Sequence, residues 1–475
     1  MEELIPKPKK RKKLRKPGGE SGTSAGRNTS AGGKTGKSRV KSDVPESPIE
    51  PQPTDFPPVV ALDVGTTKIA CLIGELDADG NLGRLVGSGH SPAKGMHKGV
   101  VVDLEDAAQS IRDSVSEAEA DAGYRVREAF VGVAGAHVIS MNRKVSLTNP
   151  NEDGRVTKAE REALLEKLKK VEVSSDLQLI HALPREYTLD GQDGIRRPVG
   201  MWSKKIEMSG HLVFGAINSI QNLVEAVGQA GLSTADIVLE PLASSEACLD
   251  DQDLNSGVIL VDIGGGTTDV AMFVHGRLVH TAVLPVGGNH ITRDISVGLK
   301  VPLAAAEDIK LKHGHAESHL VEDIEMLKVP IAVAGAAEDR TVTFSKKFLS
   351  RVIEARVAEI FSLVMRQARD SGYLSSVAAG MVVTGGSSQL EGICGLATNV
   401  TKLPARLGVP TVGSGAVDIP GNPVYATAVG LLLYGSRRIF LRGPSQPPEP
   451  SITTVGLWNE VLAKVKGWFG QTGKA

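Results

Sequence analysis

The sequence contains few cysteines and few aromatic residues. Its three cysteines, Cys71, Cys248 and Cys394, lie far apart and lack the C-x-x-C spacing of metal and redox sites. We interpret all three as packed thiols in a reducing compartment. Aromatic residues make up 4% of the chain, which leaves few platforms on which single-stranded nucleic acid can stack.

Long apolar runs and net charge are also missing. No apolar run approaches the roughly 20 residues that span a bilayer, and the N-terminus lacks the apolar core of a secretory signal, which predicts a cytosolic protein. The net charge of -1 supplies no global field toward nucleic acid. At 475 residues the chain exceeds one ordinary core of about 250–300 residues, so we expect two lobes.

The first 57 residues are rich in Lys, Arg, Gly, Ser and Pro, and residues 7–16 read KPKKRKKLRK. This composition predicts a disordered tail, because it cannot bury enough apolar surface to offset its ordering entropy. The basic run can bind anionic lipid or nucleic acid, or can simply be solvated. GGKTGKS resembles a P-loop, but Asn28 and Ala31 stand where the leading glycine belongs and no apolar strand precedes it.

The ordered part is expected to begin at Val59 with a repeated α/β pattern. VVALDV, IACLIGEL and RLVGSGHS predict a three-stranded β-meander, followed by a helix from Asp103. The same outline recurs in GVILVDI, VAMFVHG and RLVHTAVLPV, followed by the helical stretch NHITRDISVGL. An acidic, glycine-rich turn follows the first strand of each unit. This repetition predicts duplication and two similar lobes.

Changes in composition and in the expected secondary structure along the chain predict its domain boundaries. A small α+β subdomain interrupts lobe 1, and a mostly helical, charged subdomain interrupts lobe 2. The expected segments are the tail 1–57, lobe 1 core 58–137 and 210–239, inserted subdomain 138–209, lobe 2 core 240–302 and 377–441, helical subdomain 303–376, Pro-rich linker 442–455 and amphipathic helix 456–470.

The turn in VDIGGGTTD is suited to phosphate. A strand that passes from Asp directly into Gly and Thr presents successive N–H groups in a tight curve, which holds phosphate oxygens. Asp262 can hold Mg²⁺ through water, and in the weaker copy, LDVGTTK, Lys68 can reach a phosphate as a point charge. Two such turns facing each other would clamp a polyphosphate. The alternative is hairpin closure, which requires neither two aspartates nor two threonines.

Three further segments fit the same nucleotide. TGGSSQL offers a backbone approach to adenosine, PVGG begins a helix whose dipole favours phosphate, and Glu307 and Lys310 share a helix face toward ribose hydroxyls. Taken singly, helix-capping glycines and an ordinary surface ion pair explain them better, whereas their order and spacing together favour a nucleotide site. The predicted nucleotide-binding residues are Asp63, Gly65, Thr66, Thr67, Lys68, Asp262, Gly264, Gly265, Gly266, Thr267, Thr268, Asp269, Gly287, Gly288, Glu307, Lys310, Gly385, Gly386, Ser387 and Ser388.

The C-terminal stretch GLWNEVLAKVKGWFG predicts an amphipathic helix. An isolated helix of about 15 residues is marginal in water, so it requires a surface. Two tryptophans beside lysines suit a bilayer interface with anionic headgroups, whereas the alternative is docking on the chain's own core or a partner groove. The proposed membrane-facing residues are Leu457, Trp458, Val461, Leu462, Lys464, Val465, Lys466, Trp468 and Phe469.

In this order, DVGTTK, EPLASSEA, DIGGGTTD, PVGG, AEDIK and TGGSSQL resemble the motifs of the actin, heat-shock chaperone and sugar kinase ATPases. Within this superfamily the chain resembles the FtsA family of bacterial cell-division proteins over about residues 59–440 and the C-terminal helix. The resemblance implies an actin-like two-lobed fold with ATP and Mg²⁺ in the cleft, and Asp63 and Asp262 on the metal side through water. It places Glu240 where relatives orient the hydrolytic water; alternatively, Glu240 ends a strand facing solvent.

The resemblance also implies a biological role. It is that of a polymerising protein, peripheral on the cytoplasmic side of the cell membrane at the division septum, with weak or regulatory ATPase activity at most. The implied partners are FtsZ, further copies of the chain, anionic lipid and later division proteins, with the FtsZ contact after Leu303 and no specific nucleic acid. The alternatives are a small-molecule kinase and a PilM-like pilus adaptor, and the tryptophan-containing helix argues against the adaptor. The long basic tail departs from the usual short FtsA N-terminus.

Overall fold

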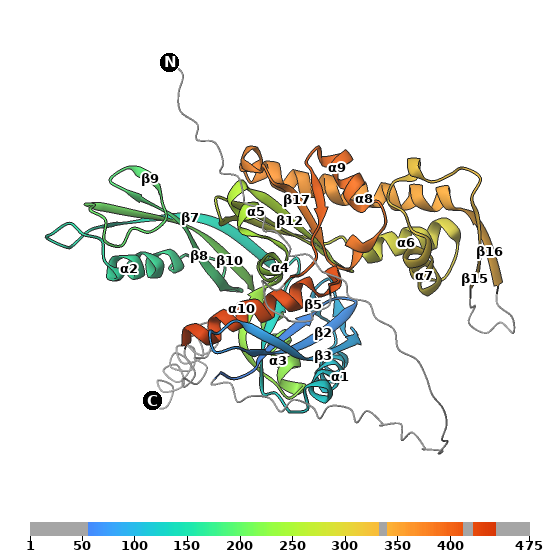
Figure 1. Ribbon diagram of the computed structural model, residues 1–475, viewed down its shortest axis with the longest axis horizontal. Helices are drawn as coiled ribbons and strands as arrows, with labels where there is room; N and C mark the ends of the chain where they lie inside the picture. The colour runs from blue at the N-terminus through green and yellow to red at the C-terminus, as the bar shows by residue number, and fades with distance from the viewer. Residues whose placement is uncertain (1–55, 332–339, 412–420, 443–475) are drawn as a thin grey trace, which may run out of the picture. The chain divides into compact units, whose positions relative to one another are not determined.

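The computed structural model describes residues 56–331, 340–411 and 421–442 (Figure 1). The basic run 7–16 and the predicted membrane helix 456–470 therefore lie outside the described residues. Within the described residues, no helix has the length and apolar character to cross a membrane.

Lobe 1 is built on a five-stranded mixed sheet. β1, β2 and β3 form the predicted antiparallel meander, and β6 and β11 add parallel strands on the other side of β1. α1, capped by the side chain of Asp103, packs with α3 against this sheet. In sheet order the strands are β11 (Ser233–Leu239), β6 (Glu128–Val133), β1 (Val59–Val64), β2 (Lys68–Leu76) and β3 (Leu82–Pro92), and the helices are α1 (Leu104–Ala122) and α3 (Ile217–Gln229).

Lobe 2 repeats this sheet with the same strand order and the same strand directions. The meander is antiparallel, and two parallel strands follow beside its first strand. Asp63 and Asp262 occupy the same position, next to last, in β1 and β12. The predicted duplication is therefore present. The strands are β14 (Arg277–Leu284), β13 (Thr268–Val274), β12 (Val258–Ile263), β17 (Gly380–Thr384) and β18 (Ala405–Leu407).

The helices and short elements around these sheets depart from the sequence prediction in one place. The stretch 303–376, expected to be mostly helical, also contains a β-hairpin. Near Ser388 a 3₁₀ turn precedes the helix that begins at Ile393. The elements are β4 (Met96–His97), β5 (Val100–Val101), α4 (Glu240–Cys248), α5 (Asp251–Ser256), α6 (Gly288–Leu299), α7 (Leu303–His313), η1 (Ser318–Leu320), β15 (Met326–Ile331), β16 (Arg340–Ser345), α8 (Lys346–Asp370), η2 (Leu374–Ser376), η3 (Gly386–Gln389), α9 (Ile393–Thr401), η4 (Pro423–Tyr425) and α10 (Ala426–Arg442).

The inserted subdomain is a four-stranded antiparallel sheet with α2 on one face (Figure 1). Thr157 and Glu160 form a capping box that starts α2, and Leu164 and Leu168 bury its apolar side. Residues 210–216 were expected to resume the lobe 1 core, but they continue β10 and pair with β7 and β8. The elements are β7 (Val138–Thr148), α2 (Lys158–Lys169), β8 (Leu177–Leu189), β9 (Gln192–Ile195) and β10 (Lys205–Ala216).

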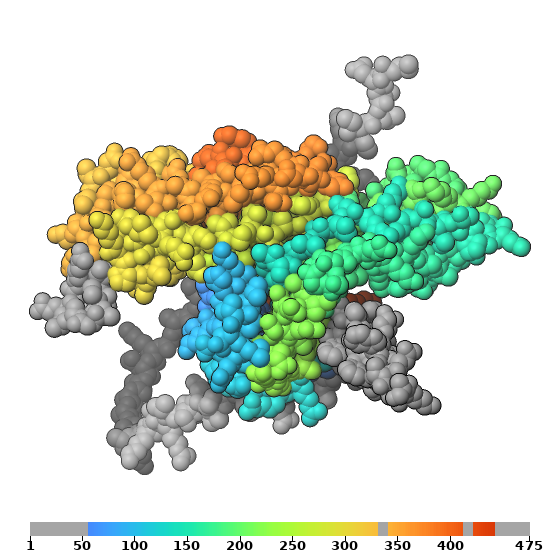
Figure 2. Space-filling model, turned by 180° about the vertical axis from the view of Figure 1, so that it is seen from behind, coloured from blue at the N-terminus to red at the C-terminus, as the bar shows by residue number. Residues whose placement is uncertain are grey.

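β7 of this subdomain lies against β14 of lobe 2. The Ser140 hydroxyl donates to Thr281 O at 3.0 Å, and Asn142 Nδ2 donates to Val279 O at 3.0 Å. His211, 1% exposed, lies 2.8 Å from Asn142 Oδ1 through Nδ1 and 3.1 Å from Thr281 Oγ1 through Nε2. Because Asn142 Oδ1 only accepts, Nδ1 of His211 carries a proton. The teal surface of the subdomain adjoins the yellow surface of lobe 2 (Figure 2).

Helices α4 and α10 join the two lobes through one hydrophobic core. Side chains of both helices pack with β1 and β2 on one side and with β12 and β13 on the other. The crossing is close: a Cβ at Gly430 would lie 1.8 Å from Ala243 O, so this position requires glycine. The far end of α10 meets the start of the described chain, where the Phe56 and Phe440 ring centroids are 5.9 Å apart.

Candidate functional site

The two predicted phosphate turns have the same backbone geometry. In the first, Gly65 N donates to Lys68 O at 3.1 Å, and in the second, Gly264 N donates to Thr267 O at 3.0 Å. Each turn joins the first two strands of a meander. They do close hairpins, but that alternative does not account for what surrounds them.

The two turns face each other directly. A Cβ at Gly265 would lie 2.3 Å from Thr67 Cγ2, and a Cβ at Gly266 would lie 2.7 Å from Thr66 Oγ1. Any side chain at these two glycines would displace Thr66 or Thr67 of the opposite turn. The Thr66 hydroxyl also accepts from Gly99 N at 3.0 Å, which ties the first turn to the β4–β5 hairpin.

The PVGG segment lies beside the second turn at the start of α6. We expected its N–H groups to face a phosphate, but Gly288 N donates to Gly264 O at 2.9 Å and Asn289 N donates to Gly265 O at 2.8 Å. In this arrangement, Gly287 and Gly288 fix the shape of the phosphate turn. A side chain at Gly287 would approach Gly264 O to 2.6 Å.

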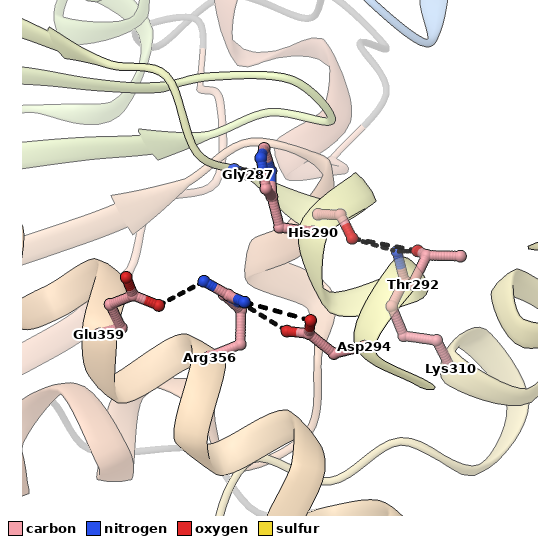
Figure 3. Close-up of polar contacts among 8 residues, drawn as sticks. Gly287, His290, Thr292, Asp294, Lys310, Arg356 and Glu359 are labelled. Carbon is pink, nitrogen blue, oxygen red and sulfur yellow. Dashed lines mark hydrogen bonds and ion pairs between the residues drawn. The ribbon is translucent and has the colours of Figure 1, made fainter. Parts of the chain in front are cut away.

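Glu307 and Lys310 form the predicted pair, with Lys310 Nζ 2.8 Å from Glu307 Oε2. This is no ordinary surface pair, because Lys310 is only 9% exposed and its ammonium donates to Thr292 Oγ1 at 2.9 Å and to Gly288 O at 3.3 Å (Figure 3). Thr292 also contacts the Glu307 carboxylate. Thr292 was not predicted from the sequence, because its only local signal is its place one helical turn after Gly288. The pair is thus connected to the phosphate turn.

Arg356 of α8 binds α6 through Asp294. Its guanidinium binds the Asp294 carboxylate at 2.6 and 3.1 Å and contacts Glu359, as Figure 3 shows. His290 accepts from Gly287 N at 3.2 Å on the same helix. These contacts position the helix that carries the glycine pair.

Four carboxylates gather behind the turns. Asp262 Oδ2 accepts from the Ser244 hydroxyl at 2.7 Å and from the Thr427 hydroxyl at 3.3 Å, and burial raises the pKa of Asp262. Burial raises the pKa of Asp63 to about 7, against the opposing effect of Lys68. The pKa of Asp269 is raised well above its usual range by burial and by Asp262.

Glu240 is the fourth carboxylate and the first residue of α4. It is partly buried, and a Cβ at Gly132 would lie 3.1 Å from its Cγ, so it does not end a strand facing solvent. Its pKa is raised well above the usual range by burial and by the other carboxylates, with Asp63 first. Four neighbouring carboxyl groups, of which Asp262 and Asp269 are buried and the other two partly buried, cannot all be ionised unless a cation neutralises them.

The carboxylates suit a divalent cation held through water. In the described part of the chain, no group of three or more His, Cys, Asp or Glu side chains forms a direct metal-ligand set. One oxygen of Asp269 is buried without a hydrogen-bond partner among the described residues. Hard oxygen donors with raised pKa values match Mg²⁺, which retains several of its waters in proteins.

Lys68 is a positively charged residue near these carboxylates, with Asp63 as its charged neighbour. Its Nζ lies 3.6 Å from the centre of the Tyr425 ring and has no hydrogen-bond partner among the described residues. Burial lowers the pKa of Lys68. A buried ammonium without an acceptor is poised for an anion. Tyr425 was not predicted, because its contact with Lys68 depends on chain folding over more than three hundred residues.

The predicted adenosine loop lies next to the metal-side aspartate. Gly385 has φ 85°, and a Cβ there would lie 2.2 Å from Asp262 Oδ1. Gly386 is open by comparison, with only Val424 within 3.8 Å of its Cβ position. The Ser387 hydroxyl donates to Gly264 O at 3.2 Å, so this loop is hydrogen-bonded to the phosphate turn.

Ser388 and Thr268, which were predicted to contact the nucleotide, bind backbone carbonyls of the chain. The Ser388 hydroxyl is buried and donates to Gly385 O at 2.7 Å, and the Thr268 hydroxyl is buried and donates to Val286 O at 2.8 Å. Both side chains hold the site's backbone. Thr267 lies 3.3 Å from Asp269 Oδ2 through its hydroxyl.

Comparison with known proteins agrees with this arrangement. The family model for cell division protein FtsA matches residues 259–430, and the model for the SHS2 domain inserted in FtsA matches residues 135–214. The cell division protein FtsA of Pseudomonas aeruginosa is 41% identical over 380 residues, covering 80% of this chain and 89% of that protein. The chain belongs to the FtsA family. The Escherichia coli FtsA is 34% identical over 423 residues, covering 88% of this chain and 98% of that protein.

Solved structures show the actin-like fold that the motifs implied. A chain of the PilM-PilN type IV pilus biogenesis complex matches with a TM-score of 0.56 at 17% identity, covering 80% of this chain and 98% of that chain. MreB5 of Spiroplasma citri, solved bound to ADP, matches with a TM-score of 0.50 at 15% identity, covering 82% and 99%. The inserted subdomain of this FtsA-family chain corresponds to the SHS2 match.

Proposed function

We propose that this FtsA-family chain binds Mg²⁺-ATP between its lobes, polymerises on the cytoplasmic face of the cell membrane at the septum, and tethers the FtsZ ring there while recruiting later division proteins. The observation that supports the cleft assignment is the direct opposition of the two phosphate turns, with Lys68 and Asp262 beside them. The match to a nucleotide-bound MreB5 agrees with it in fold.

Binding would use the two turns as donors. N–H groups and the hydroxyls of Thr66 and Thr67 would hold phosphate oxygens, Lys68 would supply charge, and Asp63 and Asp262 would hold Mg²⁺ through water. The magnesium ion neutralises phosphate charge when bound. Because polyphosphate must enter where Gly265 meets Thr67, binding requires the lobes to separate slightly at this point.

Turnover would be slow. Glu240 would orient water, but burial and the neighbouring carboxylates raise its pKa, which favours the protonated form, and a protonated carboxyl is a poor proton acceptor. A bound cation would lower that pKa. The cleft therefore serves mainly to hold nucleotide and set the lobes for polymerisation.

The membrane contact would be the C-terminal amphipathic helix. Its tryptophans and lysines match an interfacial helix, and one such helix binds reversibly, so polymerisation strengthens attachment through avidity. FtsZ would dock on the subdomain after Leu303, where Leu311 and Ile324 are 70% and 85% exposed.

The decisive experiment is co-sedimentation with anionic vesicles and purified FtsZ. Trp458→Glu combined with Trp468→Glu should strongly reduce the amount of both the chain and FtsZ that sediments with vesicles at physiological salt. Trp202→Glu is the matched control, because Trp202 is 65% exposed on the inserted subdomain. Unchanged sedimentation of the double variant would refute membrane attachment through this helix.

The cleft is tested separately by calorimetry. Asp262→Ala should weaken Mg²⁺-ATP binding at least about tenfold, since a buried charged partner contributes about 1.5–3 kcal/mol. Asp308→Ala, an exposed aspartate on α7, is the control. Equal affinity in the Asp262 variant would remove the cleft assignment.

A further inference from the structure

The basic run in residues 7–16 has no part in the function proposed above. Eight of its ten residues are Lys or Arg, and the first 55 residues contain no aromatic side chain. A cluster of four to eight basic residues is the composition that anionic lipid headgroups attract. Stacking on bases, which strengthens binding to single-stranded nucleic acid, needs aromatic rings that this segment lacks.

The structure shows where this segment joins the folded chain. The Phe56 ring packs against the Phe440 ring of α10, with 5.9 Å between the ring centroids. Gly80, in the turn between β2 and β3, lies under the same ring, because a Cβ there would be 2.0 Å from it. The start of the folded region and the end of α10 are therefore neighbours.

The lengths of the two segments that lead from Phe56 and Phe440 limit how far each can reach. The 14 residues between Arg442 and Leu457 can span at most about 50 Å, so a membrane-bound C-terminal helix holds Phe440 within that distance of the lipid. The 39 residues between Lys16 and Phe56 can span up to about 130 Å. The basic run can thus reach the same membrane whenever the helix is bound.

We propose that the run in residues 7–16 is a second membrane contact, which binds anionic headgroups of the bilayer that holds the C-terminal helix. The inference rests on the proposed membrane attachment of that helix. Stable peripheral attachment commonly needs two signals, of which a polybasic segment is one. Because Phe56 and Phe440, from which the two segments lead, are neighbours, the first contact would raise the effective concentration of the second at the same bilayer.

The test compares two full-length variants with the same loss of charge. In the run variant, Lys9, Lys10, Arg11, Lys12 and Lys13 are changed to Gln; in the control, Arg27, Lys34, Lys37, Arg39 and Lys41 are changed to Gln. Binding is measured by flotation with phosphatidylglycerol-containing vesicles and with pure phosphatidylcholine vesicles.

We expect the run variant to bind anionic vesicles at least about tenfold more weakly, because each basic residue near such a surface contributes about fivefold. The control should stay within about twofold, and the difference should vanish at high salt, which screens the run but not the apolar helix face. Wild-type binding by the run variant would overturn the proposal. Equal loss in both variants would also overturn it, since tail charge alone would then suffice.

Two further measurements separate this proposal from its rivals. In the full chain carrying Trp458→Glu and Trp468→Glu, the run should leave weak, salt-sensitive binding to anionic vesicles. Weaker binding of this double variant than of the wild type, with a salt-sensitive remainder, supports both the helix contact and the run contact. Binding of the double variant equal to that of the wild type would refute the helix contact and support the run contact alone. A run variant that keeps vesicle binding but loses binding to a DNA duplex would overturn the lipid assignment in favour of nucleic acid.

Discussion

Lys68 is placed to change nucleotide affinity and chain stability in opposite directions. Its ammonium is buried over Tyr425 with no hydrogen-bond acceptor among the described residues, and attraction to Asp63 only partly offsets the cost of burying the charge in the ligand-free chain. Lys68→Met keeps the unbranched stem and places a sulfur atom against the ring, which is a favourable contact. The substitution removes the charge alone.

The expected magnitudes follow from these contacts. A charged hydrogen bond to phosphate contributes about 1.5–3 kcal/mol, so the variant should bind ADP and ATP about 10–150-fold more weakly. An unsatisfied buried polar group costs about 1–3 kcal/mol, and the lost cation–π contact offsets about 0.5–2 kcal/mol of that. The unliganded variant should therefore be as stable as the wild type or slightly more stable.

Calorimetry and thermal unfolding check the two signs on one preparation. Lys158→Met, an exposed lysine on α2, is the matched control and should alter neither quantity. Wild-type affinity in the Lys68 variant would refute the phosphate role. A clear loss of unliganded stability would refute the argument that the ammonium lacks a partner.

Three further predictions follow from other parts of the fold. Gly385→Ala should destabilise the chain at least about 2 kcal/mol more than Gly372→Ala in urea unfolding, because both have positive φ but only Gly385 would clash with a neighbouring carboxylate. Burial lowers the pKa of His181 to about 4 and of His211 to about 3, so the unfolded chain binds protons first as the pH falls below about 6.5. Each histidine should therefore remove about 2 kcal/mol from the free energy of unfolding by pH 5. The double variant His181→Gln with His211→Gln should abolish this loss. Glu240→Gln should slow phosphate release at least about 100-fold with nucleotide affinity within twofold, and unchanged release would exclude it from turnover.

The repeated unit was predictable because its signals are local. Alternating apolar strands, the acidic glycine turns and the Asp103 cap each occupy a few consecutive residues, and their recurrence indicated two similar sheets. The identity of the glycine turns as opposing loops also followed, since duplicated units present the same edge.

Contacts between distant residues were not predictable in the same way. Ser244 and Thr427 both bind Asp262, and Tyr425 covers Lys68, but no spacing connects these positions. The hairpin β15–β16 was not predicted, because the charged helical stretches before and after it led us to expect a mostly helical subdomain, although its β-branched residues favour strands. Residues 210–216 were assigned to the lobe 1 core because β10 is long enough to contain two strand-like patterns.

The joint between β7 and β14 also limits how copies of this chain can associate. Both strands are edges of their sheets, and an open edge invites a strand from another molecule. Here Ser140 and Asn142 occupy two carbonyls of β14 with side chains, so the edges cover each other without forming a shared ladder. Copies of this chain therefore cannot associate by adding a strand between β7 and β14, because each of these edges is already covered by the other.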